Sequence, residues 1–515
     1  MKQPSISLVE LPATSFGRLG NPAVNNTFSF ARYPARANPL LHAILLRERF
    51  RDVRSINPDF NNPRGELSLD DYARIIDSDW LLLSALSRTI DSTKELANLY
   101  KQANPDGKVV IGGHHATALP EEVLQWADIV VLREGDKTLP ELIKNGDPNG
   151  IKGTAWKKGN EIIFEEPRPL LTQEEFDNLP IPYFEGNVRK RARSVPLNTA
   201  RGCLYNCDFC SVRSFFGDED NPYVGEPLDS NGCKRPYIRR SVESVIDELA
   251  SYIDMPGRAV MITDDLFYDD KFGAHEHVES AKHLLEAIIR TKEDIRQLRK
   301  KKLIIQSRVT ASRDKEFLDL FKRAGGTATC VGVESIIPET LKAMKKGQTV
   351  EEINHGLYEF GKAGIWRHIM MILGMHGETR EDLRKTSEWA NQHGDSYQGF
   401  SVVPLPGTQL AKEMAEKGRL LFPQNDPHYY LYDGHYVLVR PENMTSHELQ
   451  QDIVAGTRSF YSWKNYRKNM FGKNYWPVRL RLVSYGSKSV DKFLADPQTV
   501  DHLKRLKAHH DLVKS

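Results

Sequence analysis

Two stretches of the chain alternate short apolar runs with helical patterns, and this alternation limits the possible folds more than any other feature. In the first stretch the expected strands are Val53–Ile56, Trp80–Ser84, 108–111 and 129–132, and the expected helices are 40–49, 92–103 and 121–126. The alternation resumes from residue 195 to about residue 413. Strands that alternate with helices form parallel sheets, because each helix carries the chain back across the sheet. We therefore predict an α/β protein.

Length and local composition suggest where this chain divides. A chain of 515 residues is too long for one ordinary core, so several domains are expected. Residues 149–193 are polar and rich in proline, with a hairpin pattern at 151–166. We predict one domain at 1–150, a linker at 151–194, a second domain at 195–415 and a mainly helical extension at 416–515.

Composition excludes two broad functional classes. The hydrophobic content of 40%, the charged content of 27% and the net charge of +2 show no global bias toward nucleic acid. The longest apolar runs fall far short of the roughly twenty residues that span a bilayer. The first ten residues lack a long apolar core behind a basic start, so we expect no export and a location in the reducing cytoplasm.

Three of the five cysteines lie close together, at Cys203, Cys207 and Cys210. This C-x3-C-x2-C spacing suits three irons of a [4Fe-4S] cube, whose fourth iron would stay open to a small molecule. Three alternatives remain: a zinc site, which would need a fourth ligand, a disulfide with one thiol left over, and plain core packing. The open iron favours chemistry over electron transfer alone.

The segment from Arg201 to Cys210 resembles the signature of the radical S-adenosylmethionine (radical SAM) enzymes, with Phe209 just before the last cysteine. The resemblance implies that Cys203, Cys207 and Cys210 ligate the cube and that the open iron binds SAM. In that family one electron cleaves SAM to methionine and a 5'-deoxyadenosyl radical, which abstracts hydrogen from an unactivated carbon. It also implies a partial (β/α)6 barrel for the second stretch, with the site at the carboxyl ends of the strands.

Several later strand ends match the same family in order. The resemblance assigns the SAM amino group to the acidic strand end, the SAM carboxylate to an arginine, the ribose to a glutamate and the adenine to a glycine-containing strand. Each match is weak by itself, since an Asp pair at a strand end is more often a turn or helix cap. The residues are, in that order, Thr263, Asp264 and Asp265, then Arg308, Glu334 and Gly374.

The first stretch resembles the cobalamin (vitamin B12)-binding-type domain, a Rossmann-like (flavodoxin-like) fold that precedes many radical SAM domains. Glycines would let the backbone approach a flat ligand, and small serines could hydrogen-bond it. The alternative is a plain strand-to-helix turn. No Asp-x-His-x-x-Gly motif occurs here, so we expect no histidine beneath cobalt, or a domain that has lost the cofactor. The candidate residues are Ser84, Ser87, Gly112, Gly113, His114, Glu134 and Gly135.

Three further features have weaker interpretations. Cys233 lies near the cluster motif and most simply is a loop cysteine. The basic run at 189–193 is a solvated face or a landing site for a reductant or an anionic substrate. Basic and aromatic residues at 460–482 form a helical cap or contact a membrane surface peripherally.

These observations lead to one main functional hypothesis and two alternatives. The main one is a cobalamin-dependent radical SAM enzyme (class B methyltransferase-like) that methylates an unactivated carbon. The first alternative is radical cyclisation or carbon–carbon bond formation on a lipid or tetrapyrrole without cobalamin. The second is a non-catalytic iron–sulfur or zinc-binding module. The expected partners are a small-molecule or lipid substrate and an electron donor such as flavodoxin or ferredoxin, with no nucleic acid.

Overall fold

The structure is a computed structural model that describes residues 3–11, 34–57, 68–203, 205–216, 237–268, 275–422, 428–468, 486 and 488–514. These residues form two compact units. The first unit contains the described residues up to 203, together with 211–216 and 237–257. The second contains 205–210 and the described residues from 258 onward. The four-part division of the chain given above stays a prediction.

A seven-stranded sheet forms the centre of the first unit, in the order β2-β1-β3-β4-β5-β6-β7. The first five strands are parallel. The prediction does not include β1, although β1 pairs with both β2 and β3. The strands are β1 (Ile6–Val9), β2 (Val53–Ile56), β3 (Trp80–Ser84), β4 (Lys108–Gly112), β5 (Ile129–Val131), β6 (Thr154–Lys158) and β7 (Glu161–Phe164).

The predicted hairpin forms, but it extends the sheet instead of lying apart from it. β6 pairs antiparallel with β5, with Val130 opposite Ala155, and β7 pairs antiparallel with β6. The parallel order β2-β1-β3-β4-β5 is that of flavodoxin-like folds. The predicted fold class of this part is therefore confirmed.

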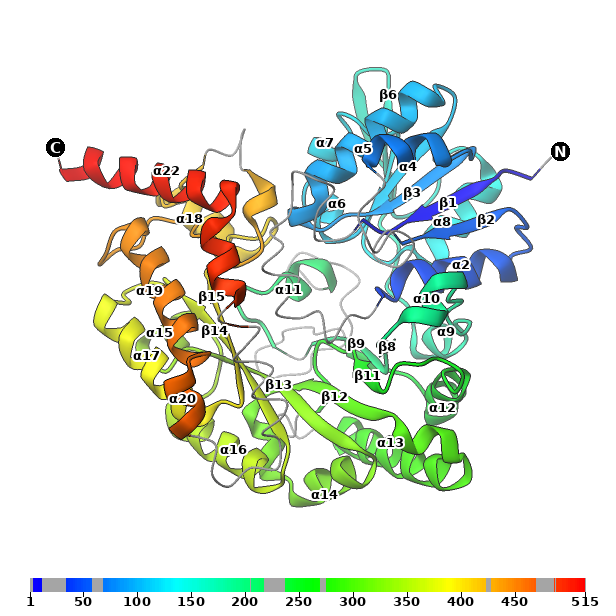
Figure 1. Ribbon diagram of the computed structural model, residues 1–515. Helices are drawn as coiled ribbons and strands as arrows, with labels where there is room; N and C mark the ends of the chain where they lie inside the picture. The colour runs from blue at the N-terminus through cyan, green and yellow to red at the C-terminus, as the bar shows by residue number, and fades with distance from the viewer. Residues whose placement is uncertain are drawn as a thin grey trace. The chain divides into compact units, whose positions relative to one another are not determined.

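Helices cover both faces of this sheet. Figure 1 shows α4 and α5 above the strands and α2 below them. The apolar core between these layers includes Leu8, Leu45, Leu82 and Val110. The helices are α2 (Ala37–Arg47), α4 (Leu69–Ile75), α5 (Ile90–Ala103), α6 (His114–Ala118), α7 (Pro120–Val123), α8 (Gly135–Asn145), α9 (Gln173–Asp177), α10 (Gly186–Arg191), α11 (Ser211–Phe216) and α12 (Val242–Ser251).

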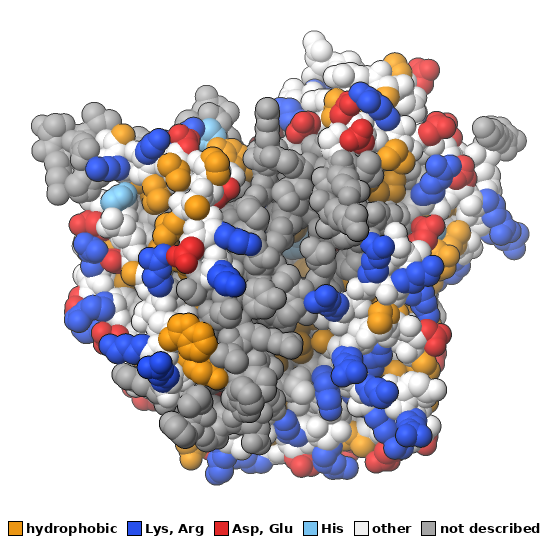
Figure 2. Space-filling view, viewed as in Figure 1, with side chains coloured by type: hydrophobic (Ala, Val, Ile, Leu, Met, Phe, Trp, Pro, Cys, Tyr) orange, Lys and Arg blue, Asp and Glu red, His pale blue; other side chains and the backbone are white. Residues whose placement is uncertain are grey.

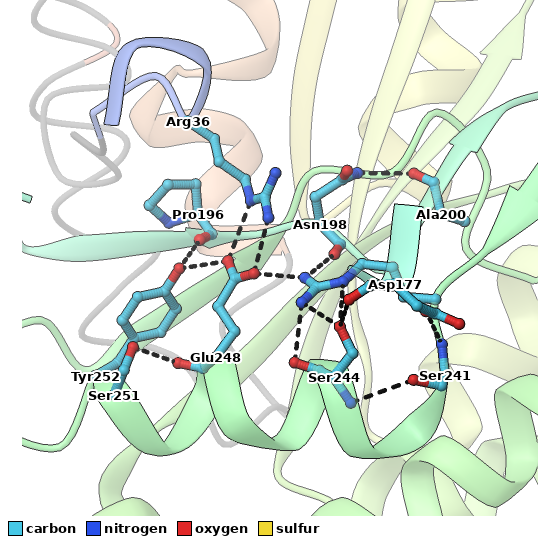
Figure 3. A network of polar contacts seen from close by, with 11 residues as sticks. Arg36, Asp177, Pro196, Asn198, Ala200, Ser241, Ser244, Glu248, Ser251 and Tyr252 are labelled. Atoms are coloured by element: carbon cyan, nitrogen blue, oxygen red, sulfur yellow. Dashed lines mark hydrogen bonds and ion pairs between the residues drawn. The ribbon is translucent and has the colours of Figure 1, made fainter. Parts of the chain in front are cut away.

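A buried polar network fastens α12 to the segments before α2 and around β8 (Ser194–Leu197) (Figure 3). Arg36 donates two hydrogen bonds to the fully buried carboxylate of Glu248, at 3.1 and 2.8 Å. Arg240 also pairs with Glu248, and the Tyr252 hydroxyl lies 2.8 Å from the Pro196 carbonyl oxygen. Burial opposes ionisation, but the Arg36 charge holds the pKa of Glu248 below its ordinary value. A buried carboxylate paired in this way keeps its segments in place.

The second unit contains five parallel strands in the order β15-β14-β13-β12-β11. Figure 1 shows α13, α14, α16 and α17 along the outer side of these strands. The elements are β11 (Ala259–Ile262), α13 (His275–Asp294), β12 (Lys302–Ser307), α14 (Lys315–Arg323), β13 (Gly326–Glu334), α15 (Pro338–Ala343), α16 (Val350–Lys362), β14 (Trp366–Leu373), α17 (Arg380–His393) and β15 (Ser396–Ser401). This alternation agrees with the predicted barrel.

The carboxyl-terminal part contains α18 (Gln409–Glu416), α19 (Ser446–Phe460), α20 (Trp463–Lys468) and α22 (Pro497–Lys514), and the described residues between α18 and α19 are mostly turns and extended segments. Cys233 and most of the basic and aromatic segment at 460–482 lie outside the described residues. Among the helices that are described, none combines the length and the apolar character needed to cross a membrane.

Candidate functional site

A cavity of about 280 Å³ opens at the carboxyl ends of the parallel strands in the first unit. Leu8 of β1, Ser84 of β3, Gly112 of β4 and Val131 of β5 all line it. Between β1 and β3 the strand order reverses, and open α/β sheets bind ligands at such a switch point. The cavity therefore lies where this fold holds a ligand.

The two glycines at the end of β4 have different structural reasons. Gly113 has φ of +97°, and an added Cβ would come within 2.8 Å of the Ala85 carbonyl oxygen. The strand-to-helix turn therefore requires glycine there. A Cβ on Gly112 would meet nothing closer than 3.7 Å, although Gly112 lines the cavity. The turn explains Gly113, while Gly112 leaves room for a ligand.

His114 follows these glycines and also lines the cavity. Its ring stacks on Phe215, with ring centroids 4.3 Å apart. Burial lowers the pKa of His114, so the imidazole is neutral near pH 7. Its Nδ1 is buried and has no hydrogen-bond partner among the described residues. A polar atom in that situation fits a ligand that supplies the missing bond.

The two predicted serines differ in position. Ser84 is exposed and lines the cavity. Ser87 is buried, and its hydroxyl lies 3.0 Å from Nδ1 of His115. Ser87 is not among the described residues that line the cavity, because its hydroxyl contacts His115 on α6 instead.

Glu134 and Gly135 line the same cavity, together with three charged residues that the sequence analysis did not assign to it, Arg133, Asp136 and Arg201. Arg201 donates to Glu134 at 2.5 Å and to both oxygens of Asp136 at 2.8 and 3.1 Å. Burial raises the pKa of Glu134. Burial also disfavours the ionised form of Asp136, but the Arg201 charge outweighs it and lowers the pKa of that carboxyl. The feature of the sequence that could have identified Arg201 as a site residue is its position two residues before Cys203.

In the second unit, cationic side chains hold residues 205–210 of the cysteine segment. The Arg308 guanidinium lies 3.7 Å from the centre of the Tyr205 ring, and Lys345 pairs with Asp208 at 3.2 Å. The backbone turns at Cys210, whose N–H donates to the Cys207 carbonyl at 3.1 Å. Arg308 is predicted to bind the SAM carboxylate. In this structure its guanidinium packs on the cysteine segment.

Glu334, the predicted ribose ligand, is already paired in this structure. Its Oε1 lies 2.8 Å from Nζ of Lys346, and both side chains are almost fully buried. The Lys346 ammonium also lies 5.8 Å from the centre of the Phe209 ring. Glu334 has φ of 66°, a conformation that costs a non-glycine residue about 1–3 kcal/mol. The sequence analysis did not identify Lys346, because this lysine lies twelve residues after Glu334 and belongs to no recognisable motif.

The acidic strand end follows β11 as expected. Asp264 is fully buried, and its carbonyl oxygen accepts a hydrogen bond of 3.1 Å from the Gln306 side chain on β12. Asp265 is exposed and Thr263 is half-buried. The structure thus brings the carboxyl ends of β11 and β12 together, which the predicted SAM site requires.

Gly374 has a structural reason of its own. Its φ is +89°, and an added Cβ would lie 2.4 Å from Leu449 on α19. Its N–H donates to Glu378 Oε2 at 2.8 Å, and the Met375 N–H donates to the same oxygen at 3.1 Å. Close packing and a local turn therefore account for this glycine.

Replacing Glu378 by Gln is expected to remove a pH dependence of stability. Burial raises the pKa of Glu378 from 4.5 to about 7, so the fold favours the protonated carboxyl. The stabilisation is complete below the unfolded pKa and is lost as pH rises through about 7. Between pH 5 and pH 8, urea unfolding of the apoprotein should show a fall in stability that is about 2–3 kcal/mol larger in the wild type than in Glu378→Gln. Parallel pH profiles in the two proteins would contradict this.

The three cysteines of the motif have the donor chemistry for an iron–sulfur cluster. Cys207 is buried, while Cys203 and Cys210 are half-buried. Within the described part of the chain, no three or more His, Cys, Asp or Glu side chains stand ready to hold a metal ion. Their assignment as ligands therefore rests on spacing and on donor type.

Two family models match the chain. The B12 binding domain model matches residues 39–143, and the Radical SAM superfamily model matches residues 197–390. The chain therefore contains a B12-binding domain followed by a radical SAM domain. The predicted fold class and domain types are thereby confirmed, and a [4Fe-4S] cluster, SAM and cobalamin are the cofactors that these two domain types imply.

Known relatives of this chain have names that indicate several activities. It is 28% identical over 412 residues to an uncharacterized methyltransferase of Pyrococcus horikoshii, covering 77% of this chain and 82% of the relative. It is 25% identical over 414 residues to the anaerobic magnesium-protoporphyrin IX monomethyl ester cyclase of Cereibacter sphaeroides, covering 77% of this chain and 62% of that enzyme.

A solved structure shares the fold of this chain. The cobalamin-dependent S-adenosylmethionine radical enzyme OxsB, with aqua-cobalamin and S-adenosylmethionine bound, superposes with a TM-score of 0.68 at 16% identity. The match covers 99% of this chain and 76% of OxsB. Gly112 and His114 lie within the residues matched by the B12 binding domain model, which also supply most of the cavity wall, and the cavity fits a bound cofactor.

Proposed function

We propose that this radical SAM protein is a cobalamin-dependent methyltransferase that acts on an unactivated carbon. The observation that carries the proposal is the cavity at the switch point of the B12-binding domain. A cavity in that place can hold a further cofactor besides the cluster and SAM. The P. horikoshii relative, a methyltransferase by name, supports the same reaction class.

Each part of the chain has a distinct role in this proposal. Cys203, Cys207 and Cys210 would hold the cluster. The strand ends with Thr263, Asp264, Asp265, Arg308 and Glu334 would bind SAM, with Phe209 and Gly374 beside it. When bound, the cluster supplies the electron that cleaves SAM, and cobalamin supplies the methyl group.

Side chains of the B12-binding domain would orient the cobalamin and keep water away from it. Leu8, Leu82, Leu83 and Val110 form an apolar wall of the cavity. Ser84 and the neutral His114 supply hydrogen-bonding atoms on the same wall. A mostly apolar wall with a few polar atoms is the usual composition of a cofactor site.

The cyclase relative gives a second reaction class a specific basis. A protein 25% identical to this chain closes a ring on a tetrapyrrole ester, as its name states. Radical ring closure or carbon–carbon bond formation on a lipid or tetrapyrrole would need the SAM site but would transfer no methyl group. A non-catalytic metal-binding module would need neither a SAM site nor a methyl donor.

The proposed partners are a small-molecule or lipid substrate and a reductant such as flavodoxin or ferredoxin, in the reducing cytoplasm. Lys190, Arg191 and Arg193 of the basic run are exposed, as a landing site for an acidic reductant requires. Figure 2 shows Lys and Arg side chains over much of the visible face, mixed with Asp and Glu. A mixed surface of this kind favours small partners over nucleic acid.

Anaerobic reconstitution with iron, sulfide, SAM, cobalamin and a reductant tests the proposal. We expect 5'-deoxyadenosine to form and cobalamin to remain bound in about equal amount to the protein. Mass spectrometry of small-molecule and lipid extracts should then show a product heavier by one methyl group. SAM cleavage without bound cobalamin would favour the cyclase-like reaction, and no SAM cleavage would favour the non-catalytic module.

A further inference from the structure

We infer that Arg201, Glu134 and Asp136 form a clamp that couples filling of the B12-binding cavity to the seating of Cys203 as a cluster ligand. The inference rests on the proposed function, because it concerns how two of its cofactors influence each other. The three side chains are positioning residues, since none of them is expected to touch a reacting atom.

The geometry of the clamp is specific. The guanidinium of Arg201 makes a two-point contact with Asp136, at 2.8 and 3.1 Å, and a third contact of 2.5 Å with Glu134. The planar fork of arginine matches a carboxylate in this way, which a lysine cannot do. The second oxygen of Glu134 accepts the Leu171 N–H at 2.8 Å, so the carboxylate itself cannot swing freely.

Because its three side chains are largely buried, the clamp holds them firmly in their relative positions. The exposed fractions of the Arg201, Glu134 and Asp136 side chains are 15%, 8% and 7%. The guanidinium also lies 4.9 Å from the centre of the Phe176 ring. Breaking a buried charge pair leaves an uncompensated charge, so these groups resist separation.

The chain connects the clamp directly to the first cluster ligand. Arg201 lies on β9 (Ala200–Gly202), and Cys203 follows two residues later. Two residues span at most about 7 Å, so fixing Arg201 restricts where the Cys203 thiol can reach. Between them Gly202 has φ of 84°, a left-handed turn that sets the direction in which the chain leaves the strand.

The same three side chains form part of the cavity wall. Glu134, Asp136 and Arg201 line the cavity together with Gly112 and His114. A cofactor in the cavity therefore packs against the clamp and removes its remaining exposure to water. A ligand that interacts differently with the ordered and the loosened clamp shifts the equilibrium between them, and the effect is reciprocal. Cobalamin should thus favour cluster assembly, and the assembled cluster should favour cobalamin.

The test measures cobalamin affinity of the full chain with and without its cluster. Equilibrium dialysis with hydroxocobalamin, followed by cobalt analysis, gives both dissociation constants anaerobically. We expect the wild type to bind at least about fivefold more tightly when the cluster is present. In Arg201→Met the ratio of the two constants should fall to about one, and Arg201→Lys should restore it only in part.

Two further variants separate coupling from folding. Asp136→Asn keeps the shape of the side chain and should also bring the ratio toward one, even where Arg201→Met folds poorly. The matched control is Arg367→Met on β14, which removes a buried arginine paired with Asp395 at 2.8 Å, the two side chains being 8% and 7% exposed. Because Arg367 does not line the cavity as described, its variant should lower the melting temperature and keep the wild-type ratio.

The outcomes are distinct. A ratio of one in the wild type, or a wild-type ratio in both Arg201→Met and Asp136→Asn, would overturn the coupling while leaving the proposed function intact. Failure of the wild type to bind cobalamin in either form would overturn the proposed function and the coupling with it. Loss of the ratio in Arg367→Met as well would show that any buried defect removes it, and would also overturn the inference.

Discussion

Replacing Cys207 by Ala is expected to remove the visible absorption of the reconstituted cluster and to reduce SAM cleavage by more than about 100-fold. The estimate is conservative, since losing even an outer partner of a metal ligand typically costs 10- to 100-fold. Cys207 is the buried member of the three, and its carbonyl oxygen accepts the Cys210 N–H at 3.1 Å. Iron content, the absorption spectrum and 5'-deoxyadenosine formation measure the effect.

Cys330 provides the matched control for this prediction. It lies on β13, and burial raises the pKa of its thiol to about 12, so the thiol stays protonated and unable to ligate iron. Cys330→Ala should therefore keep the absorption and the iron content of the wild type, and so should Cys233→Ala. Loss of the cluster in either control, with retention in Cys207→Ala, would refute the ligand assignment.

Replacing Lys346 by Met is expected to destabilise the radical SAM domain by about 3–5 kcal/mol. The change leaves Glu334 buried and charged without its 2.8 Å partner. Glu334 also occupies a left-handed backbone conformation, with φ of 66°, which the ion pair helps to maintain. Urea unfolding of the apoprotein at pH 8 measures the loss of stability. In parallel, the SAM dissociation constant of the reconstituted protein should rise.

A double variant isolates the charge from the packing. Glu334→Gln combined with Lys346→Met removes both charges and should recover most of the lost stability, because burying two neutral groups avoids the uncompensated carboxylate. Recovery of stability without recovery of SAM binding would support the proposed ribose contact of Glu334. A double variant as unstable as Lys346→Met would show that packing on Phe209, rather than the charge, is the main contribution of Lys346.

Local patterns predicted the parts of the fold that depend on neighbours in sequence. The apolar runs of β2, β3 and β4 and the turn at Gly113 are visible in the chain, since strand alternation and left-handed glycine are local requirements. Strand β1 escaped, although it pairs with both β2 and β3 in the sheet. Its place in the sheet depends on its pairing with these two strands, which are distant from it in the sequence.

Residue roles were harder to predict than elements. Ser87 looks like Ser84 in sequence, yet one hydroxyl is buried against His115 and the other lines the cavity. Gly374 suggests an open backbone beside a ligand, whereas the structure shows Leu449 packed closely against it. A side chain's surroundings come from other elements, so residue type and order along the chain do not reveal them.

The sequence by itself determined the cluster motif and the order of the two domains. Cys203, Cys207 and Cys210 lie within one short segment, so covalent spacing alone suits them to a single cluster. Only the tertiary structure revealed the clamp on Arg201, whose partners Glu134 and Asp136 are 67 and 65 residues away. The physical reason is that the fold, not the local chain, pairs buried charges, and here it joins the cysteine segment to the wall of the cavity.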